Sequence, residues 1–229
     1  MKDKDTLEVF WTLPYLQKEF KSSPLSYFSH LIGHEGENSL LSYLKAEDYA
    51  MELQASADSE LDCMSDFSVT ITLTKKGLKN HEKVLDAVFK YIQRLKEVGP
   101  QEWVFNESRK IGTIEFEFAE KGEPMDLAVK LTEKMAQFKT PEDMAHIIRH
   151  AYVADEYKPE SLHEIATVLA DPSKAIVLLA SKSLEDSTLP ITEKWYKFNY
   201  SLEKFSEARI EQLRAPDVAA NGKNLDLPP

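Results

Sequence analysis

The chain has 229 residues, of which 42% are hydrophobic, so it is long enough to bury a sizeable core as one large domain or two small ones. It carries 39 Asp and Glu against 28 Lys and Arg, and this net charge of −11 argues against a nucleic-acid or anionic-membrane surface. The single cysteine, Cys63, excludes an internal disulfide and indicates a reducing compartment.

The first hundred residues predict an alternation of strands and helices. Apolar residues at every second position predict strands, and apolar residues at helical spacing predict amphipathic helices. In chain order, we expect a strand over residues 6–13, helices over 24–32 and 37–47, strands over 49–57 and 66–74, and a helix over 81–98. The two short helices are separated by the tight polar turn Gly33-His34-Glu35-Gly36, whose glycines allow another backbone to approach closely.

The second half is predicted to be mostly helical. We expect helices over residues 100–119, 125–138, 141–150, 159–169 and 206–214, and strands over 175–180 and 195–201. The run 175–180 is continuously apolar, which is typical of a central strand buried on both faces. The aromatic side chains of 100–119 are most simply interpreted as core.

Strands are few and are separated by helical blocks. This order predicts an α/β layered fold, with helices packed on a mostly antiparallel or mixed sheet. We expect residues 1–229 to form a single domain, with 216–229 as the start of a linker to a following domain. No segment is apolar enough to span a bilayer and the N-terminal residues do not form a signal peptide, so we expect a cytoplasmic location.

Several short motifs occur in a fixed order along the chain. They are Trp11-Thr-Leu-Pro14, Tyr27, His30-Leu-Ile-Gly-His-Glu-Gly36, Ser39-Leu-Leu-Ser-Tyr-Leu-Lys45, Gly99-Pro-Gln-Glu-Trp-Val-Phe105, Ser181-Lys-Ser183, Glu193-Lys-Trp-Tyr196 and Asn224-Leu-Asp-Leu-Pro-Pro229. This ordered set resembles the second, non-catalytic domain of the insulinase (insulysin/pitrilysin) family of zinc metallopeptidases. The resemblance covers essentially the whole chain and implies the α/β roll that the family's domains share.

The resemblance implies a peptide-binding exosite, which holds the N-terminal end of a substrate away from the catalytic zinc. The implied exosite residues are His30, Gly33, His34, Glu35, Gly36, Leu53, Gln54, Ala55, Ser56 and Ala57. An exposed strand edge can hydrogen-bond an extended peptide, and Glu35 can attract its α-amino group. The alternative is that residues 33–36 are a plain helix-to-helix turn and 53–57 an ordinary strand.

This sequence departs from the family pattern at four places. Insulysin proper has a glycine pair at Ala55-Ser56, Gly-Trp at Asp48-Tyr49 and Pro-Gly at Glu37-Asn38. A second backbone is therefore expected to approach Ala55-Ser56 less closely than it would approach a glycine pair. The family's polyanion-binding arginine aligns with Glu123, which puts polyanion regulation in doubt.

The family's catalytic signature, His-x-x-Glu-His on one helix, is absent from the chain. We therefore expect no catalytic residue, no metal ligand and no cofactor in this chain. The resemblance implies that the chain is part of a larger peptidase, here called the parent, whose catalytic domain holds the zinc. A weaker alternative is a small metalloenzyme using Glu142, His146 and His150; helix-end His residues more often interact with the helix dipole. Cys63 has acidic neighbours and is not expected to be a nucleophile.

Two functions stay open from the sequence. The first is a non-catalytic substrate-binding domain of an insulinase-like zinc metalloendopeptidase, which lines the peptide chamber and anchors the substrate N-terminus. The alternative is a catalytically dead structural or scaffolding subunit of the same family. The implied partners are peptide substrates and other domains of the parent, with homodimerisation of the parent as a further possibility; nucleic acid and membranes are not expected.

Overall fold

The computed structural model describes residues 4–58, 63–120, 122–138, 140–184 and 189–215. The strands are β1 (Asp5–Pro14), β2 (Ala50–Asp58), β3 (Met64–Leu73), β4 (Ala175–Ala180), β5 (Ile191–Thr192) and β6 (Asn199–Tyr200). The helices are α1 (Pro24–Ile32), α2 (Leu40–Ala46), α3 (Lys75–Lys79), α4 (His81–Val98), α5 (Glu102–Glu117), α6 (Pro124–Gln137), α7 (Pro141–Met144), α8 (Pro159–Leu169) and α9 (Glu207–Arg214). Short 3-10 turns lie at η1 (Gln17–Glu19), η2 (Arg149–Ala151) and η3 (Pro172–Lys174).

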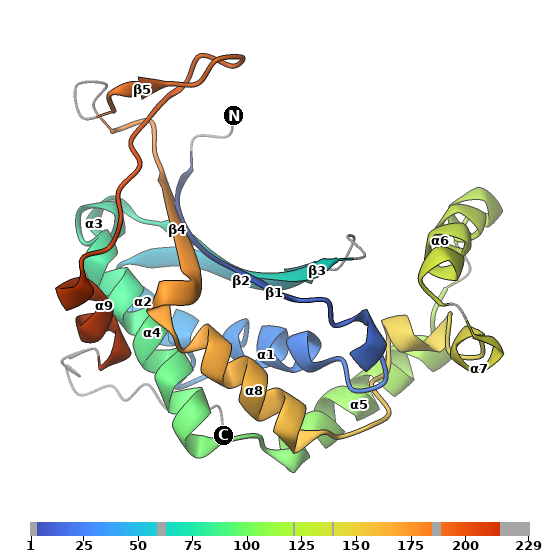
Figure 1. Cartoon of the computed structure of the whole chain (residues 1–229). Helices are drawn as coiled ribbons and strands as arrows, with labels where there is room; N and C mark the ends of the chain where they lie inside the picture. Colours follow the sequence, from blue (N-terminus) through green and yellow to red (C-terminus); the bar gives the residue numbers. More distant parts are fainter. Residues whose placement is uncertain (1–3, 59–62, 121, 139, 185–188, 216–229) are drawn as a thin grey trace.

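Four strands form one antiparallel sheet in the order β2-β3-β1-β4. Val9 of β1 lies opposite Val69 of β3 and Val177 of β4, which fixes the register across the centre of the sheet. Figure 1 shows α1, α4 and α8 along one face of this sheet, whereas none of the described helices lies across the other face. The predicted α/β class with helices on an antiparallel sheet is confirmed.

The core lies between the sheet and these helices. Strand β1 alternates as its sequence predicts, with Leu7, Val9, Trp11 and Leu13 all buried. The Trp11 ring lies 6.0 Å from the ring of Phe67 on β3 and 6.2 Å from that of Phe89 on α4. Trp11 therefore links two strands and the longest helix in one aromatic cluster, a contact type that contributes beyond the area it buries.

A β-bulge sets the register of the edge strand β2. Ala50 and Leu53 are three positions apart, so a regular strand would place their side chains on opposite faces, yet both are buried. The pairing with β3 shifts between Ala50 and Glu52, so Met51 is the extra residue and is exposed. Beyond the bulge, Glu52, Gln54 and Ser56 point to the uncovered face of the sheet.

The helices α1, α4 and α8 have the predicted bounds. Helix α2 begins at Leu40, later than predicted, because the Oγ of Ser39 accepts a hydrogen bond from the backbone N–H of Ser42 and caps the helix there. The predicted helix over 141–150 is wrong as a single element, since only α7 and the short η2 form within it. The predicted strand over 195–201 reduces to β6, which pairs with β5.

Two predictions of burial are wrong. Strand β4 is an edge strand, not a central one, and its side chains at Ile176 and Leu178 are 65% and 57% exposed because they point to the uncovered face. The aromatic side chains of 100–119 are not all core either, since Trp103 on α5 and Phe118, the residue that caps its C-terminus, are exposed. An apolar run in a sequence shows that burial is favourable, but it does not show whether this chain supplies the covering layer.

Replacing Trp11 by Ala is expected to lower the free energy of unfolding by about 3–5 kcal/mol, because it removes a fully buried ring and leaves a cavity. The matched control is Trp195→Ala, since Trp195 is 76% exposed, and its effect is expected to stay within about 0.5 kcal/mol. Urea unfolding followed by far-UV circular dichroism measures both. Equal losses in the two variants would contradict the assignment of Trp11 to the core.

Candidate functional site

The turn after α1 lies directly against the edge strand β2. Gly33 ends the helix, and its N–H donates to the carbonyl of Ser29 at 2.9 Å. A Cβ atom built on Gly33 would lie 3.8 Å from the backbone nitrogen of Ala55 and 3.7 Å from its Cβ. The structure therefore brings together the two segments, 30–36 and 53–57, that the sequence analysis assigned to one exosite.

The side chain of His34 stabilises the turn through a hydrogen bond with the backbone. Its Nδ1 accepts a hydrogen bond from the backbone N–H of Gly36 at 3.0 Å, which requires that Nδ1 carry no hydrogen. A Cβ on Gly36 would lie 2.3 Å from Cε1 of the same ring, so only glycine fits beneath the imidazole as it stands. His34 thus holds the turn in shape, and the ring lies 6.3 Å from that of His30.

His30 and Glu35 have contrasting surroundings. His30 is half-buried, and burial lowers its pKa, while the carboxylate of Glu107 on α5 raises it and His34 lowers it. Glu35 is exposed, and we find no ion pair for it within the described part of the chain. The turn therefore presents the Glu35 carboxylate to solvent, whereas the imidazole of His30 is partly sheltered.

Strand β2 supplies the other half of the site. Leu53 is buried and Ala55 half-buried against the helical layer, whereas Gln54, Ser56 and Ala57 are exposed. β3 pairs with one side of β2, and no strand among the described residues pairs with its other side. An edge strand of this kind presents unpaired backbone N–H and C=O groups to an incoming extended chain.

The structure adds neighbours that the sequence did not indicate. Glu107 influences His30 from a different helix, and Glu52 accepts from Lys4 Nζ at 2.7 Å and from Thr72 Oγ1 at 3.4 Å. Ser68 Oγ lies 3.1 Å from Ser56 Oγ. These contacts join residues far apart in the chain, so no local motif could have revealed them; the alternation of polar residues along β3 was the one available signal.

Two departures from the family pattern fall where the backbone is left-handed. Asn38 and Asp48 have φ values of 64° and 59°, a region that glycine adopts without cost. Asn and Asp are the other residues best tolerated there, because their short polar side chains can bond locally. Asn38 and Asp48 therefore form the turns on the two sides of α2 in a backbone region that glycine also adopts.

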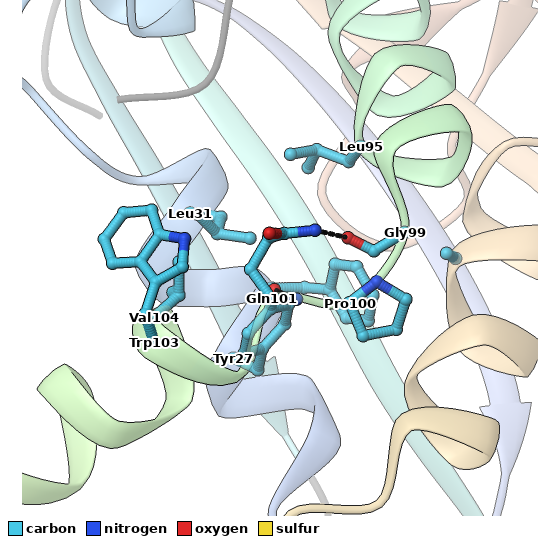
Figure 2. A pocket seen from close by; sticks show the side chains of 10 residues that line it. Tyr27, Leu31, Leu95, Gly99, Pro100, Gln101, Trp103 and Val104 are labelled. Atoms are coloured by element: carbon cyan, nitrogen blue, oxygen red, sulfur yellow. Dashed lines mark hydrogen bonds between the residues drawn. The ribbon is translucent and has the colours of Figure 1, made fainter. Parts of the chain in front are cut away.

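The motif over residues 99–105 forms the corner between α4 and α5. Figure 2 shows Tyr27 and Gln101 meeting beside Gly99, with the Gln101 Nε2 donating to the Gly99 carbonyl at 3.1 Å. The Gln101 backbone N–H donates to Tyr27 Oη at 2.9 Å, and burial raises the pKa of Tyr27. The adjoining cavity is about 10 Å³, which is about the size of a single water molecule, so this motif is structural.

The structure does not bring together the residues of the weaker metal hypothesis. Glu142, His146 and His150 are all described, and no group of three or more His, Cys, Asp or Glu residues within the described ranges is placed to hold a metal ion. His150 packs instead against the ring of Phe138 at 4.6 Å and lines a cavity of about 80 Å³. Burial, with smaller effects of Lys134 and His146, lowers its pKa from 6.5 to about 4.

Cys63 is exposed. Within the described residues, no helix combines the length and apolar character needed to cross a lipid bilayer.

Two family models match the chain and together cover most of it. Residues 2–111 match the "Peptidase M16 inactive domain", and residues 116–229 match the "Middle or third domain of peptidase_M16". The boundary between the two matches falls inside α5.

Curated relatives and solved structures agree with this assignment. The chain is 33% identical to human insulin-degrading enzyme over 223 residues (97% of this chain, 21% of the relative) and 32% identical to the A-factor-processing enzyme of Saccharomyces cerevisiae over 218 residues (95% and 20%). It thus spans about a fifth of the length of these relatives. Its fold matches pitrilysin with a TM-score of 0.82 at 21% identity (93% of this chain, 22% of that one) and the first half of the periplasmic protease PqqL of Escherichia coli with a TM-score of 0.58 at 10% identity (95% and 45%).

Gly33→Ala is expected to lower the free energy of unfolding by about 1–3 kcal/mol, because the new Cβ would lie 2.7 Å from the carbonyl oxygen of Ser29. Gly122→Ala is the control, since nothing lies within 4 Å of a Cβ there. Chemical denaturation of both variants measures the difference. A loss for Gly122→Ala as large as that for Gly33→Ala would show that the close approach to α1 and β2 is not the cause.

His150 is expected to make stability depend on pH. Its pKa is about 4 in the folded chain and 6.5 without burial, so its contribution is fully present above pH 6.5 and is lost as the pH falls towards 4. The wild type is expected to lose about 1–2 kcal/mol of its free energy of unfolding to this group between pH 6.5 and 4, a value kept small because the ring is only half-buried. The His150→Gln variant should not show this part of the loss. His163→Gln, at an exposed position on α8, should keep the wild-type pH profile; a His150→Gln profile that is unchanged would contradict the assignment.

Proposed function

The chain belongs to the insulinase (M16) family of peptidases, and from that premise we propose that it is a non-catalytic, substrate-binding domain of a larger zinc metalloendopeptidase. In this proposal the domain lines the peptide chamber of its parent and anchors the N-terminal end of the substrate. The observation that carries the proposal is the contact of the turn 33–36 with an edge strand whose outer side is unpaired within the described residues.

The physical basis is addition of a strand to β2. An extended peptide beside β2 completes the backbone hydrogen bonds that the edge leaves open, and this binding tolerates many sequences because it uses main-chain groups. Glu35 provides a negative charge at the end of the site, where it can pair with a protonated α-amino group. Gly33 has no side chain to keep the peptide away from this corner.

Zinc belongs elsewhere in this proposal. The chain lacks the His-x-x-Glu-His motif, and its described residues do not assemble a set of zinc donors. The residues present therefore do not fit the metal, and no hydrolytic step is assigned to them. The zinc and the water that it activates would come from another domain of the parent.

We also propose that residues 1–229 act as one domain; the predicted linker over 216–229 lies outside the described residues. The support is the core, which includes Leu7 of β1, Val104 of α5 and Leu213 of α9 in one contiguous cluster and so spans both family matches. Other domains of the parent are proposed partners, as is a second copy of the parent. A cytoplasmic location is proposed on the presence of a single cysteine.

The test is titration of the chain with short peptides that differ only in a free or acetylated N-terminus. Acetylation is expected to weaken binding by roughly 1 kcal/mol, the scale of a charge-assisted contact, and Glu35→Gln is expected to weaken binding of the free peptide by a similar amount. The Glu35→Gln variant should bind the free and the acetylated peptide with the same affinity, because the two changes remove the same contact.

Glu203→Gln is the control, since Glu203 is also exposed but lies outside the site; it should bind like the wild type. Equal affinities for both peptides in every variant would remove the anchoring proposal. Failure of all peptides to bind would favour the alternative, a catalytically dead scaffolding subunit of the same family.

A further inference from the structure

The uncovered face of the sheet is polar and acidic beside β2. Its side chains there are Glu52, Gln54 and Ser56 on β2 and Asp66, Ser68, Thr70 and Thr72 on β3, all directed away from the helices. The opposite end of the same face is apolar, with Phe10 of β1 in register with the exposed Ile176 of β4. A chain bound at the β2 edge would therefore meet the polar half of this face.

An added strand must follow the pleat of the sheet. Successive side chains of a strand point to opposite faces, so every second side chain of a peptide beside β2 would project over the uncovered face. There it would lie next to Glu52, Gln54 or Ser56, because neighbouring strands are about 5 Å apart. The remaining side chains would project towards the helical layer.

The charges on the uncovered face are unbalanced. Glu8, Glu52 and Asp66 lie on it, against the single described basic residue Lys4, which pairs with Glu52 at 2.7 Å. The Oδ1 atom of Asp66 is buried and has no hydrogen-bond partner within the described residues. Because this oxygen is enclosed by the protein, the acidic group that an incoming peptide can reach at the β2 edge is the Glu52 carboxylate.

The helical side of the same edge is confined. Gly33 approaches Ala55 so closely that a Cβ on Gly33 would be in contact with it, and the imidazole of His34 fills the turn beyond. The side chains along this side of the edge are small at Gly33, Ala55 and Gly36. A peptide side chain that points this way therefore has room only if it is small as well.

We propose that the edge of β2 selects basic peptides, in which Lys or Arg side chains at alternate positions lie over the uncovered face and small side chains point to the turn. This inference rests on the proposed peptide-binding function and adds its substrate class. Glu52 is the principal specificity-determining residue, because it lies on the edge strand itself and is largely exposed. Its pairing with Lys4 shows that the position already accommodates an ammonium group.

The test uses four short peptides with free N-termini, each with Ala at every second position. Two carry Lys at the intervening positions, in the even or the odd register, and two carry Glu in the same registers. In one register we expect the Lys peptide to bind about tenfold more tightly than its Glu counterpart, with a much smaller ratio in the other register. High salt should reduce the preference, since the charges are partly exposed.

Glu52→Gln is expected to reduce that tenfold ratio to about threefold or less, while Glu203→Gln should leave it unchanged. Circular dichroism of each variant checks that the fold is retained, and Lys4→Met should increase the preference by releasing Glu52. Peptides that bind equally well whatever their charge, or a preference unchanged in Glu52→Gln, would overturn this inference and leave the anchoring function intact. If none of the four peptides binds, the proposed function fails as well.

Discussion

Trp11 lies between Phe67 of β3 and Phe89 of α4, and this contact fixes the helical layer to one face of the sheet. Everything else about the sheet follows from this one-sided burial. The odd-numbered positions of β1 are sealed under the helices, and the even-numbered ones face outward with β3 and β4 alongside. A sheet covered once, with two edge strands, has a free face and a free edge, and these are the surfaces that can receive another chain.

The candidate site lies where the free edge meets the helical layer. Helix α1 ends at Gly33 against β2, the His34–Gly36 hydrogen bond keeps the turn compact, and Glu35 within this turn is exposed to solvent. The β-bulge at Met51 decides which β2 side chains lie over the uncovered face, and so brings Glu52 next to Thr72. The unpaired backbone groups of β2 and a row of polar side chains that includes Glu52 thus lie along one edge, and the turn that contacts this edge carries the exposed Glu35. The proposed binding of an extended chain depends on these groups.

Much of this arrangement could be predicted from local sequence. The bounds of α1, α4 and α8 follow from Pro or Gly at their ends and from helical spacing of their apolar residues, and β1 from strict alternation. Burial could not be predicted where it depends on a covering layer: Ile176 and Leu178 belong to a continuous apolar run, yet they face outward. The assignment of the turn and β2 to one site came from a resemblance to a known family. Their contact and the proximity of Glu107 to His30 could not be predicted, because they join residues distant in sequence. The hydrogen bond within the turn from Gly36 to His34 depends on side-chain geometry that the sequence does not show.

Hydrogen exchange of the folded chain, with and without a saturating short peptide, tests the central claim most directly. We expect the backbone amides of β2 that point away from β3 to become protected when the peptide binds, since the peptide supplies the carbonyl groups that they lack. The amides of β4, at the other edge of the sheet, should be unchanged. Binding that leaves the β2 amides exchanging at their original rate, or that protects β4 instead, would contradict the claim that this edge receives the peptide.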